Sequence, residues 1–253
     1  MGAHVAKVEP PDGAPMRRWQ GSDEDYSPQF AAYNRNKTTH VIDLKTSSGV
    51  AELYRLTDDA DVLIENFRPG VATRLGVGYS DLASRNPRLI YCAISGFGDT
   101  GPYATRPAYD TVISAIGGMY SQIMSLDTPA IVGPALSDLL SGMAAVQAVL
   151  AALYARAPDG GGQRIEVPMV GALLDFLTES VSTYLATGEN ATPDSRARRA
   201  QTYACAGSDG LGFIIHMSVP EKFWLGVVDA LENAALATDP RFTTRQRRIA
   251  GYA

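Results

Sequence analysis

The feature that most constrains the fold of this chain is a long apolar run near its middle. Residues 133–155 read GPALSDLLSGMAAVQAVLAALYA and contain a single charged side chain, Asp138. Apolar residues recur here at helical spacing, which predicts a buried helix with Ser137 as its N-cap. The side chains expected to anchor this helix in a core are Leu139, Leu140, Met143, Val146, Leu150 and Leu153.

Asp138 falls in the first turn of that predicted helix. Unpaired backbone N–H groups and the helix dipole favour a carboxylate at this position, so the residue could serve only to stabilise the helix. The same position would also hold a charged group at the rim of a buried helix. The surrounding motifs must decide between a capping role and a chemical one.

Short apolar runs alternate with helical patterns along the chain. Strands are predicted at 4–9, 40–44, 61–65, 89–95 and 163–168, and helices at 46–57, 69–75, 80–85, 108–125 and 169–187. Residues 14–36 are predicted to be irregular. Alternating strands and helices, with nearly continuous apolar strands, favour an α/β fold with a Rossmann-like open parallel sheet covered by helices on both faces.

The polar stretch at 188–202 is the clearest linker in the chain. We therefore expect a large α/β domain at 1–187 and the start of a second, smaller domain at 203–253. The second part is predicted to contain a hairpin, residues 203–205 paired with 212–217, followed by a helix at 220–231.

Residues 96–101, GFGDTG, follow a predicted apolar strand and match a dinucleotide-binding fingerprint. That fingerprint requires a helix to begin inside it, so that the pyrophosphate meets the helix N-terminus. Pro102 and Pro107 follow instead, which predicts a loop. A nicotinamide-dependent dehydrogenase is therefore a weak alternative.

Composition and charge exclude several other classes. The net charge is −5 with no basic block, which argues against nucleic acid as a partner. Cys92 and Cys205 stand far apart in apolar company and are expected to be buried thiols in a reducing compartment. The three histidines are widely separated, so no metal site is predicted. The N-terminus lacks the apolar core of a signal peptide, and residues 139–155 are short for a membrane span, so we expect a cytoplasmic protein without a membrane partner.

Short motifs spread over nearly the whole chain carry a family resemblance. They are 2–9 (GAHVAKVE), 34–37 (NRNK), 43–45 (DLK), 60–70 (ADVLIENFRPG), 74–76 (RLG), 86–91 (NPRLIY), 94–98 (ISGFG), 101–102 (GP), 106–110 (RPAYD), 152–156 (ALYAR), 162–163 (GQ) and 239–242 (DPRF). In combination they resemble the class III CoA-transferases of the CaiB/BaiF type, the family of formyl-CoA transferase and carnitine CoA-transferase.

The resemblance implies a specific chemistry. The nucleophilic aspartate of the family falls on Asp138, which would attack an acyl-CoA thioester, form a mixed anhydride and release the CoA thiolate. Covalent catalysis of this kind divides one difficult transfer into two easier ones. The implied substrates are an acyl-CoA and a small carboxylic acid, with no permanently bound cofactor, and the implied assembly is a homodimer, interlocked in full-length members.

The resemblance also implies which residues bind CoA. The matching positions are Ile42, Lys45, Asn66, Phe67, Arg74 and Leu75, with Arg68 as a weaker further cation. Tyr109 would lie near the acyl group, and the Gly207–Gly210 turn stands where relatives have a glycine-rich lid. Charged residues among these could equally be ordinary solvated side chains, and Tyr109 could be a core residue.

One related activity uses different residues. The α-methylacyl-CoA racemases use a His-Asp pair where this chain has Tyr109 and Asp110. A racemase would thus lack one of its two acid/base groups, which favours a transferase.

Three departures from the family pattern favour a second hypothesis. The family has a further strand and helix before Gly2, has an arginine where this chain has Pro10, and continues past residue 253. We therefore expect a chain truncated at both ends. The alternative to an active transferase is an inactive remnant that binds CoA weakly or serves as an association partner.

Overall fold

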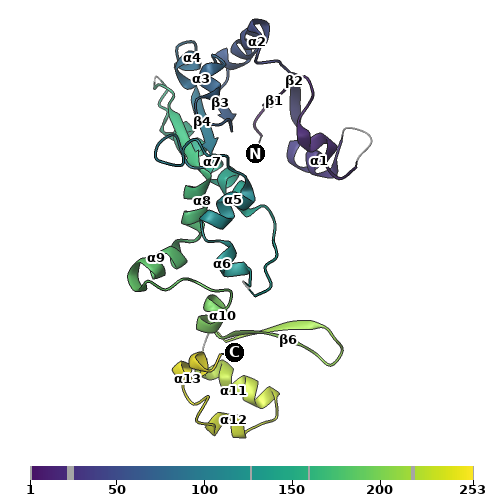
Figure 1. Cartoon of the computed structure of the whole chain (residues 1–253), viewed down its shortest axis with the longest axis vertical. Helices are drawn as coiled ribbons and strands as arrows, with labels where there is room; N and C mark the ends of the chain where they lie inside the picture. The colour runs from purple at the N-terminus through teal and green to yellow at the C-terminus, as the bar shows by residue number, and fades with distance from the viewer. Residues whose placement is uncertain (1, 22–25, 126, 159, 218–219, 253) are drawn as a thin grey trace. The chain divides into compact units, whose positions relative to one another are not determined.

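The computed structural model describes residues 2–21, 26–125, 127–158, 160–217 and 220–252. They belong to two compact units, Met1–Ile113 with Leu136–Leu173, and Ser114–Ala135 with Leu174–Ala253. Figure 1 shows the order of the elements along the chain. These two units divide the chain at other positions than the predicted domains, 1–187 and 203–253, and the predicted linker, 188–202. The domain boundaries from the sequence stay a prediction.

The strands of the first unit pair in parallel. They are β1 (Val5–Glu9), β2 (Lys37–Val41), β3 (Val62–Glu65), β4 (Ile90–Ser95) and β5 (Arg164–Pro168). Among the described residues, β1 pairs with β2 in one sheet and β3-β4-β5 form a second sheet. The predicted parallel α/β class is confirmed, although the strands make two sheets instead of one.

The second strand was predicted three residues too late. β2 ends at Val41, and Ile42 N–H then donates to the carbonyl of Glu9. The chain turns directly afterwards, because the Asp43 carboxylate accepts from Lys45 N–H at 3.0 Å. Such a local side-chain bond favours a turn over a continuing strand, which explains the shift from the predicted 40–44.

Helices occupy most of the remaining chain. In the first part they are η1 (Pro15–Gly21), α1 (Pro28–Asn34), α2 (Ser47–Asp58), α3 (Val71–Arg74), α4 (Tyr79–Ala83), α5 (Asp110–Ile116), α6 (Tyr120–Ile123), α7 (Leu136–Ala155), α8 (Met169–Phe176) and α9 (Thr178–Thr187). The prediction that residues 14–36 are irregular was wrong, because they contain η1 and α1. Ser27 caps α1 by accepting from Phe30 N–H. The predicted helix at 108–125 breaks at Gly118, whose φ is 81°, and the one at 169–187 divides at Leu177.

Helices cover both faces of the β3-β4-β5 sheet, as predicted. On one face Tyr91 and Ala93 of β4 pack with Leu82 of α4. On the other face Cys92 packs with Ala145 and Val149 of α7. Successive strand residues point to opposite faces, so the continuous apolar run of β4 is what allows both layers to form.

Helix α7 packs against the sheet with a different face from the one predicted. Its buried residues are Ser137, Ser141, Ala145, Val149 and Ala152. The predicted anchors Leu139, Met143, Val146 and Leu150 are exposed, Met143 by 60% and Leu150 by 52%, and Leu140 and Leu153 are half-buried. The reason is steric, because small side chains such as Ala145 let the helix backbone pack close to the sheet.

Helix α7 is also long and apolar enough, at 20 residues, to cross a membrane by length and composition alone. The expectation that this run is too short was therefore wrong as a statement about length. Its small-residue face packs against β4 and β5, which is the position of a sheet-covering helix of an α/β unit.

The N-terminal strand ends in a buried carboxylate. Glu9 is 1% exposed and accepts from Lys7, from Arg17 and from Ala14 N–H. Burial alone would raise its pKa, but the hydrogen bonds from Arg17, Lys7 and Ala14 outweigh burial and lower the pKa to about 2. Removing one partner of a buried ion pair destabilises a protein, because the remaining charge is left without compensation.

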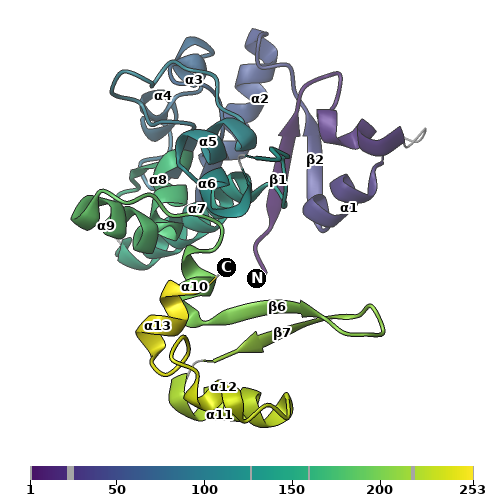
Figure 2. The same cartoon turned by 60° about the horizontal axis from the view of Figure 1, so that its bottom comes forward.

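The second unit contains the predicted hairpin. Strands β6 (Thr202–Ala206) and β7 (Gly212–His216) form an antiparallel hairpin (Figure 2). The N–H group of Gly210 donates to the carbonyl of Gly207 in the turn. The further helices are α10 (Ser195–Ala200), α11 (Pro220–Ala230), α12 (Ala235–Thr238) and α13 (Arg245–Ala250). Helix α10 thus lies inside the predicted linker. Both cysteines are free thiols, Cys92 buried as predicted and Cys205 only half-buried.

Because Ala145 is buried and Met143 is exposed on α7, we expect substitutions at these two positions to differ in their effect on stability. Ala145→Met should lower the free energy of unfolding by about 1–3 kcal/mol, because the buried face has no space for added methylenes. Met143→Ala, on the exposed face, should change it by less than about 0.5 kcal/mol. Urea denaturation of the two variants measures both, and the reverse order would show that the face predicted from sequence is the packed one.

The Glu9 cluster predicts a pH-dependent contribution to stability. Because the pKa of Glu9 is lower in the folded chain than its ordinary value of 4.5, the contribution is complete above pH 4.5 and is lost as the pH falls toward 2. Glu9→Gln should cost at most about 3 kcal/mol at pH 6 and clearly less at pH 3. Denaturation of both proteins at the two pH values checks this. An equal gap at both would exclude the ionised carboxylate as its cause.

Candidate active site

Asp138 lies in the first turn of α7, as predicted, and its side chain is exposed. Helix α7 begins at Leu136, so Ser137 lies inside the first turn and is not the predicted N-cap. The cap comes from another segment. The Asp110 carboxylate at the start of α5 accepts from Ser137 N–H at 2.7 Å and from Asp138 N–H at 3.2 Å.

The environment of Asp138 disfavours its charged form. Partial burial raises its pKa, and the negative charge of Asp110 raises it further. Both effects act against the helix dipole, which favours a carboxylate at a helix N-terminus. Asp138 therefore keeps its proton to a higher pH than an ordinary aspartate.

The capping bonds also change what the helix N-terminus can offer to a ligand. The N–H groups of Ser137 and Asp138 already donate to Asp110. They are then not available to stabilise negative charge that develops on a substrate next to Asp138.

The predicted CoA-binding residues Asn66, Phe67 and Arg74 lie in the segment that follows strand β3 of the first unit. Asn66 and Phe67 directly follow β3 and are exposed, and Arg68 is exposed beside them. Arg74 ends α3, and its guanidinium lies close to Gly70, where an added Cβ would approach it to 3.3 Å. Loops at the carboxyl ends of parallel strands are the usual ligand sites of α/β sheets.

The other three predicted CoA residues differ in exposure. Lys45 follows β2 and has an exposed side chain. Ile42 is 3% exposed, so only its backbone could meet a ligand, and Leu75 is half-buried against the core around Leu53. Tyr109, predicted to lie near the acyl group, is 69% exposed and directly precedes Asp110.

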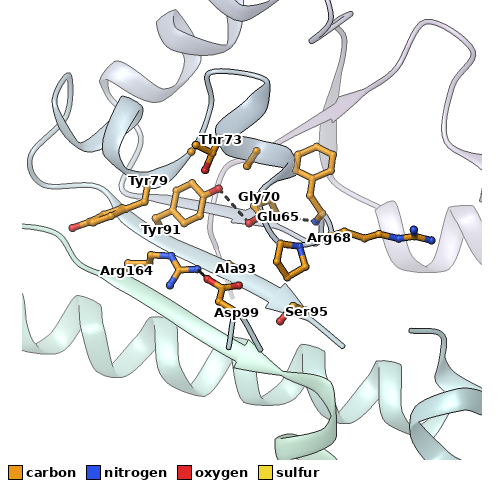
Figure 3. A pocket seen from close by; sticks show the side chains of 14 residues that line it. Glu65, Arg68, Gly70, Thr73, Tyr79, Tyr91, Ala93, Ser95, Asp99 and Arg164 are labelled. Atoms are coloured by element: carbon orange, nitrogen blue, oxygen red, sulfur yellow. Dashed lines mark hydrogen bonds and ion pairs between the residues drawn. The ribbon is translucent and has the colours of Figure 1, made fainter. Parts of the chain in front are cut away.

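A group of polar side chains that sequence reasoning missed surrounds a cavity of about 80 Å³ at the ends of β3 and β4 (Figure 3). Glu65, the last residue of β3, accepts from Phe67 N–H at 2.6 Å and from the Tyr91 hydroxyl at 3.2 Å. Arg164 forms an ion pair with Asp99 across the same cavity. Burial raises the pKa of Glu65 despite these donors, and burial and then the charge of Glu65 raise that of Tyr91.

The cavity brings together Phe67 and Arg68 of the predicted set. Asp138, Tyr109, Asn66 and Arg74 are not among the residues that line it. The one signal in the sequence that could have indicated the cavity is a glutamate that ends an apolar strand, because an acidic residue there needs partners when the strand is buried.

The Gly96–Gly101 segment is a loop, as predicted. Gly98 N–H donates to the Ser95 hydroxyl, and Asp99 N–H donates to Glu166. In the described structure the next helix after this loop is α5, which begins at Asp110. Without a helix start inside the glycine motif, a dinucleotide pyrophosphate has no N-terminus to meet.

Among the described residues, no group of three or more His, Cys, Asp or Glu side chains could hold a metal ion. The carboxylates of Asp110 and Asp138 lie at the start of α7, whereas the Tyr91 hydroxyl and the Arg164 guanidinium belong to the cavity around Glu65. The first group can supply a nucleophile, and the second offers hydrogen-bonding groups to a polar ligand.

The sequence matches known proteins over its full length. Residues 1–253 match CoA-transferase family III. The chain is 37% identical over 254 residues to an acetyl-CoA:oxalate CoA-transferase of Acetobacter aceti, covering 99% of this chain and 65% of that protein. It is 33% identical to a succinyl-CoA–D-citramalate CoA-transferase of Chloroflexus aurantiacus, covering 98% of this chain and 62% of the relative. The chain thus spans less than two thirds of the length of these two curated relatives.

The fold agrees with the sequence match. A crystal structure of a CaiB/BaiF family protein from Brucella suis superposes with a TM-score of 0.84 at 35% identity, covering 98% of this chain and 68% of that one. The resemblance expected from the motifs is therefore confirmed by both sequence and structure. This chain belongs to CoA-transferase family III.

Proposed function

We propose that this chain is a CoA-transferase that exchanges CoA between an acyl-CoA and a small carboxylic acid, with the Asp138 carboxylate as covalent nucleophile. The observation that carries the proposal is an exposed carboxylate with a raised pKa in the first turn of α7, in a chain that matches the family throughout. A carboxylate in such a setting is a candidate nucleophile, because its environment destabilises the free anion.

In the first half-reaction a carboxylate oxygen of Asp138 attacks the thioester carbonyl. A C–O bond forms, the C–S bond breaks, and CoA leaves as the thiolate, which yields an acyl-aspartyl anhydride. The thiolate then attacks the side-chain carbonyl of Asp138. The donor acid leaves as its carboxylate, and CoA remains as a thioester on Asp138.

In the second half-reaction the acceptor acid attacks that aspartyl thioester through its carboxylate, which releases the CoA thiolate and gives a second anhydride. Attack of the thiolate on the acceptor carbonyl forms the new acyl-CoA and returns Asp138 to its free form. Each step exchanges one acyl bond for another, so no oxidant, metal or other co-reactant enters the balance.

We assign CoA binding to the loops after β2 and β3 of the first unit. Asn66 and Phe67 supply an amide and an aromatic surface, and Arg74 and Lys45 supply positive charge for phosphates. Ile42 can contribute only backbone groups, and Leu75 supports the loop from the core. Relatives act, by their names, on oxalate, D-citramalate and glutarate, which supports a small carboxylic acid as acceptor.

A homodimer in the cytoplasm is part of the proposal. Two free cysteines are in keeping with a reducing compartment. The exposed apolar side chains of α7, with Met143 and Leu150 among them, would be covered in a dimer.

The nucleophile is tested by trapping. The chain is incubated with an acyl-CoA and then with hydroxylamine, which converts an activated aspartyl group to a hydroxamate, and the peptide is mapped by mass spectrometry. We expect a hydroxamate at Asp138 in the wild type, and none at residue 138 in Asp138→Ala or Asp138→Asn.

Circular dichroism of all three proteins is the control that tests whether each is folded. A folded wild-type chain that forms no adduct with acetyl-CoA, succinyl-CoA or oxalyl-CoA would contradict the proposal and favour the inactive remnant. A hydroxamate at another carboxylate would contradict the assignment of Asp138.

The hydrogen bond between Glu65 and the Phe67 backbone leads to a separate prediction about CoA affinity. Its carboxylate holds the backbone of Phe67, so Glu65→Ala should release the Asn66–Phe67 loop and weaken CoA binding by roughly tenfold, the value of one charged hydrogen bond. Glu65→Gln keeps an acceptor and should bind more tightly than the alanine variant. Calorimetric titration with CoA measures both, and equal affinity of Glu65→Ala and wild type would show that this bond does not order the loop.

A further inference from the structure

The two acidic residues at the start of α5 and α7 form one unit of structure. Asp110 is the one charged residue of α5, and Asp138 is the one charged residue of α7. The Asp110 carboxylate accepts from the backbone N–H groups of Ser137 and Asp138, at 2.7 and 3.2 Å. A helix is usually capped by the residue directly before it in sequence. Here the cap comes from Asp110, which is 28 positions before Asp138.

We propose that Asp110 is a positioning residue for Asp138, whose carboxylate fixes the backbone of the nucleophile and places a second negative charge beside it. This inference rests on the proposed function for its catalytic meaning. Its structural content, a cap and a charge acting on Asp138, stands on the geometry alone.

The capping bonds restrain the nucleophile. The first N–H groups of a helix have no partner within the helix, and a helix start without one frays. Ser137 is fully buried and Asp138 follows it directly, so fixing the backbone of both fixes the position from which the Asp138 side chain extends. Orientation of a reacting group to within a fraction of an ångström is one of the larger contributions to catalysis.

The added charge acts on the chemistry. Asp138 is negative before it attacks a thioester and neutral once it is acylated. The repulsion between Asp110 and Asp138 is therefore present in the free form and absent in the anhydride or thioester. Removing it on acylation favours the covalent intermediate over the free carboxylate.

The charged groups around Asp138 support this interpretation. Burial and the charge of Asp110 are the two causes that raise its pKa. Asp110 is therefore the charge whose removal should change the titration of Asp138.

Two variants separate the roles of Asp110. Asp110→Asn keeps an oxygen that can accept from Ser137 and Asp138 but removes the charge, whereas Asp110→Ala removes both. Asp175→Asn, an exposed acid on α8, is the matched control. The Asp138 side-chain carbonyl is titrated by ¹³C NMR, and hydrogen exchange of the Ser137 and Asp138 amides is followed on the same samples.

We expect Asp110→Asn to lower the pKa of Asp138 and to leave both amides protected. Asp110→Ala should also make the two amides exchange at least about tenfold faster, because each loses its acceptor. An unchanged pKa in Asp110→Asn, or unchanged protection in Asp110→Ala, would overturn the inference, and neither result depends on enzyme activity.

The pH dependence of hydroxamate formation adds the catalytic readout. In Asp110→Asn the acidic limb should move to lower pH, since Asp138 ionises earlier. The amount of trapped intermediate should fall by about tenfold for each pH unit by which the pKa of Asp138 falls. Normal NMR and exchange effects without any adduct in the wild type would contradict the proposed function alone. A normal adduct whose pH profile is the same in Asp110→Asn would contradict the inference alone.

Discussion

The close approach of α7 to the β3-β4-β5 sheet is the constraint on which the first unit depends. Small residues such as Ala145 and Val149 meet Cys92 and Val167 at this contact. Because the backbone of the helix lies near the sheet, rotation about its axis is restricted, and the position of Asp138 is set by packing two turns away. A larger residue on the small face would displace the first turn of α7, and with it the carboxylate.

The α/β class, the parallel pairing and both faces of the sheet could be predicted, because a continuous apolar strand such as β4 needs cover on two sides. The packed face of α7 could not. Helical spacing finds a stripe of large apolar residues but does not say whether those residues or the small ones meet the sheet, and here Ala145 is buried and Met143 is exposed. The helix predicted at 108–125 was too long, because Gly118 has a positive φ and separates α5 from α6.

The candidate site was predictable only in part, for a related reason. Asp138 follows from its place at the start of an apolar helix, together with the family motifs. Its cap does not, because Asp110 is 28 positions away in the chain and only the tertiary structure brings it to the helix start. Glu65 and Tyr91 were missed in the same way, since each looks like an ordinary strand residue until the parallel pairing of β3 and β4 brings them together.

Three effects compete at Asp138, and their balance bears on what the residue can do. The helix dipole favours the anion by about 0.3–1 kcal/mol at an exposed site, and less where the N–H groups are already occupied. Asp110 occupies two of them and brings a charge of its own, so it weakens the favourable effect and adds an unfavourable one. Partial burial acts in the same direction, and the pKa of Asp138 is raised. An aspartate that served only to cap α7 would gain from the dipole, whereas here the cap is another residue and Asp138 is left with a destabilised charge. That arrangement is of no benefit to the helix, and it is the state from which a carboxylate gains most by becoming acylated.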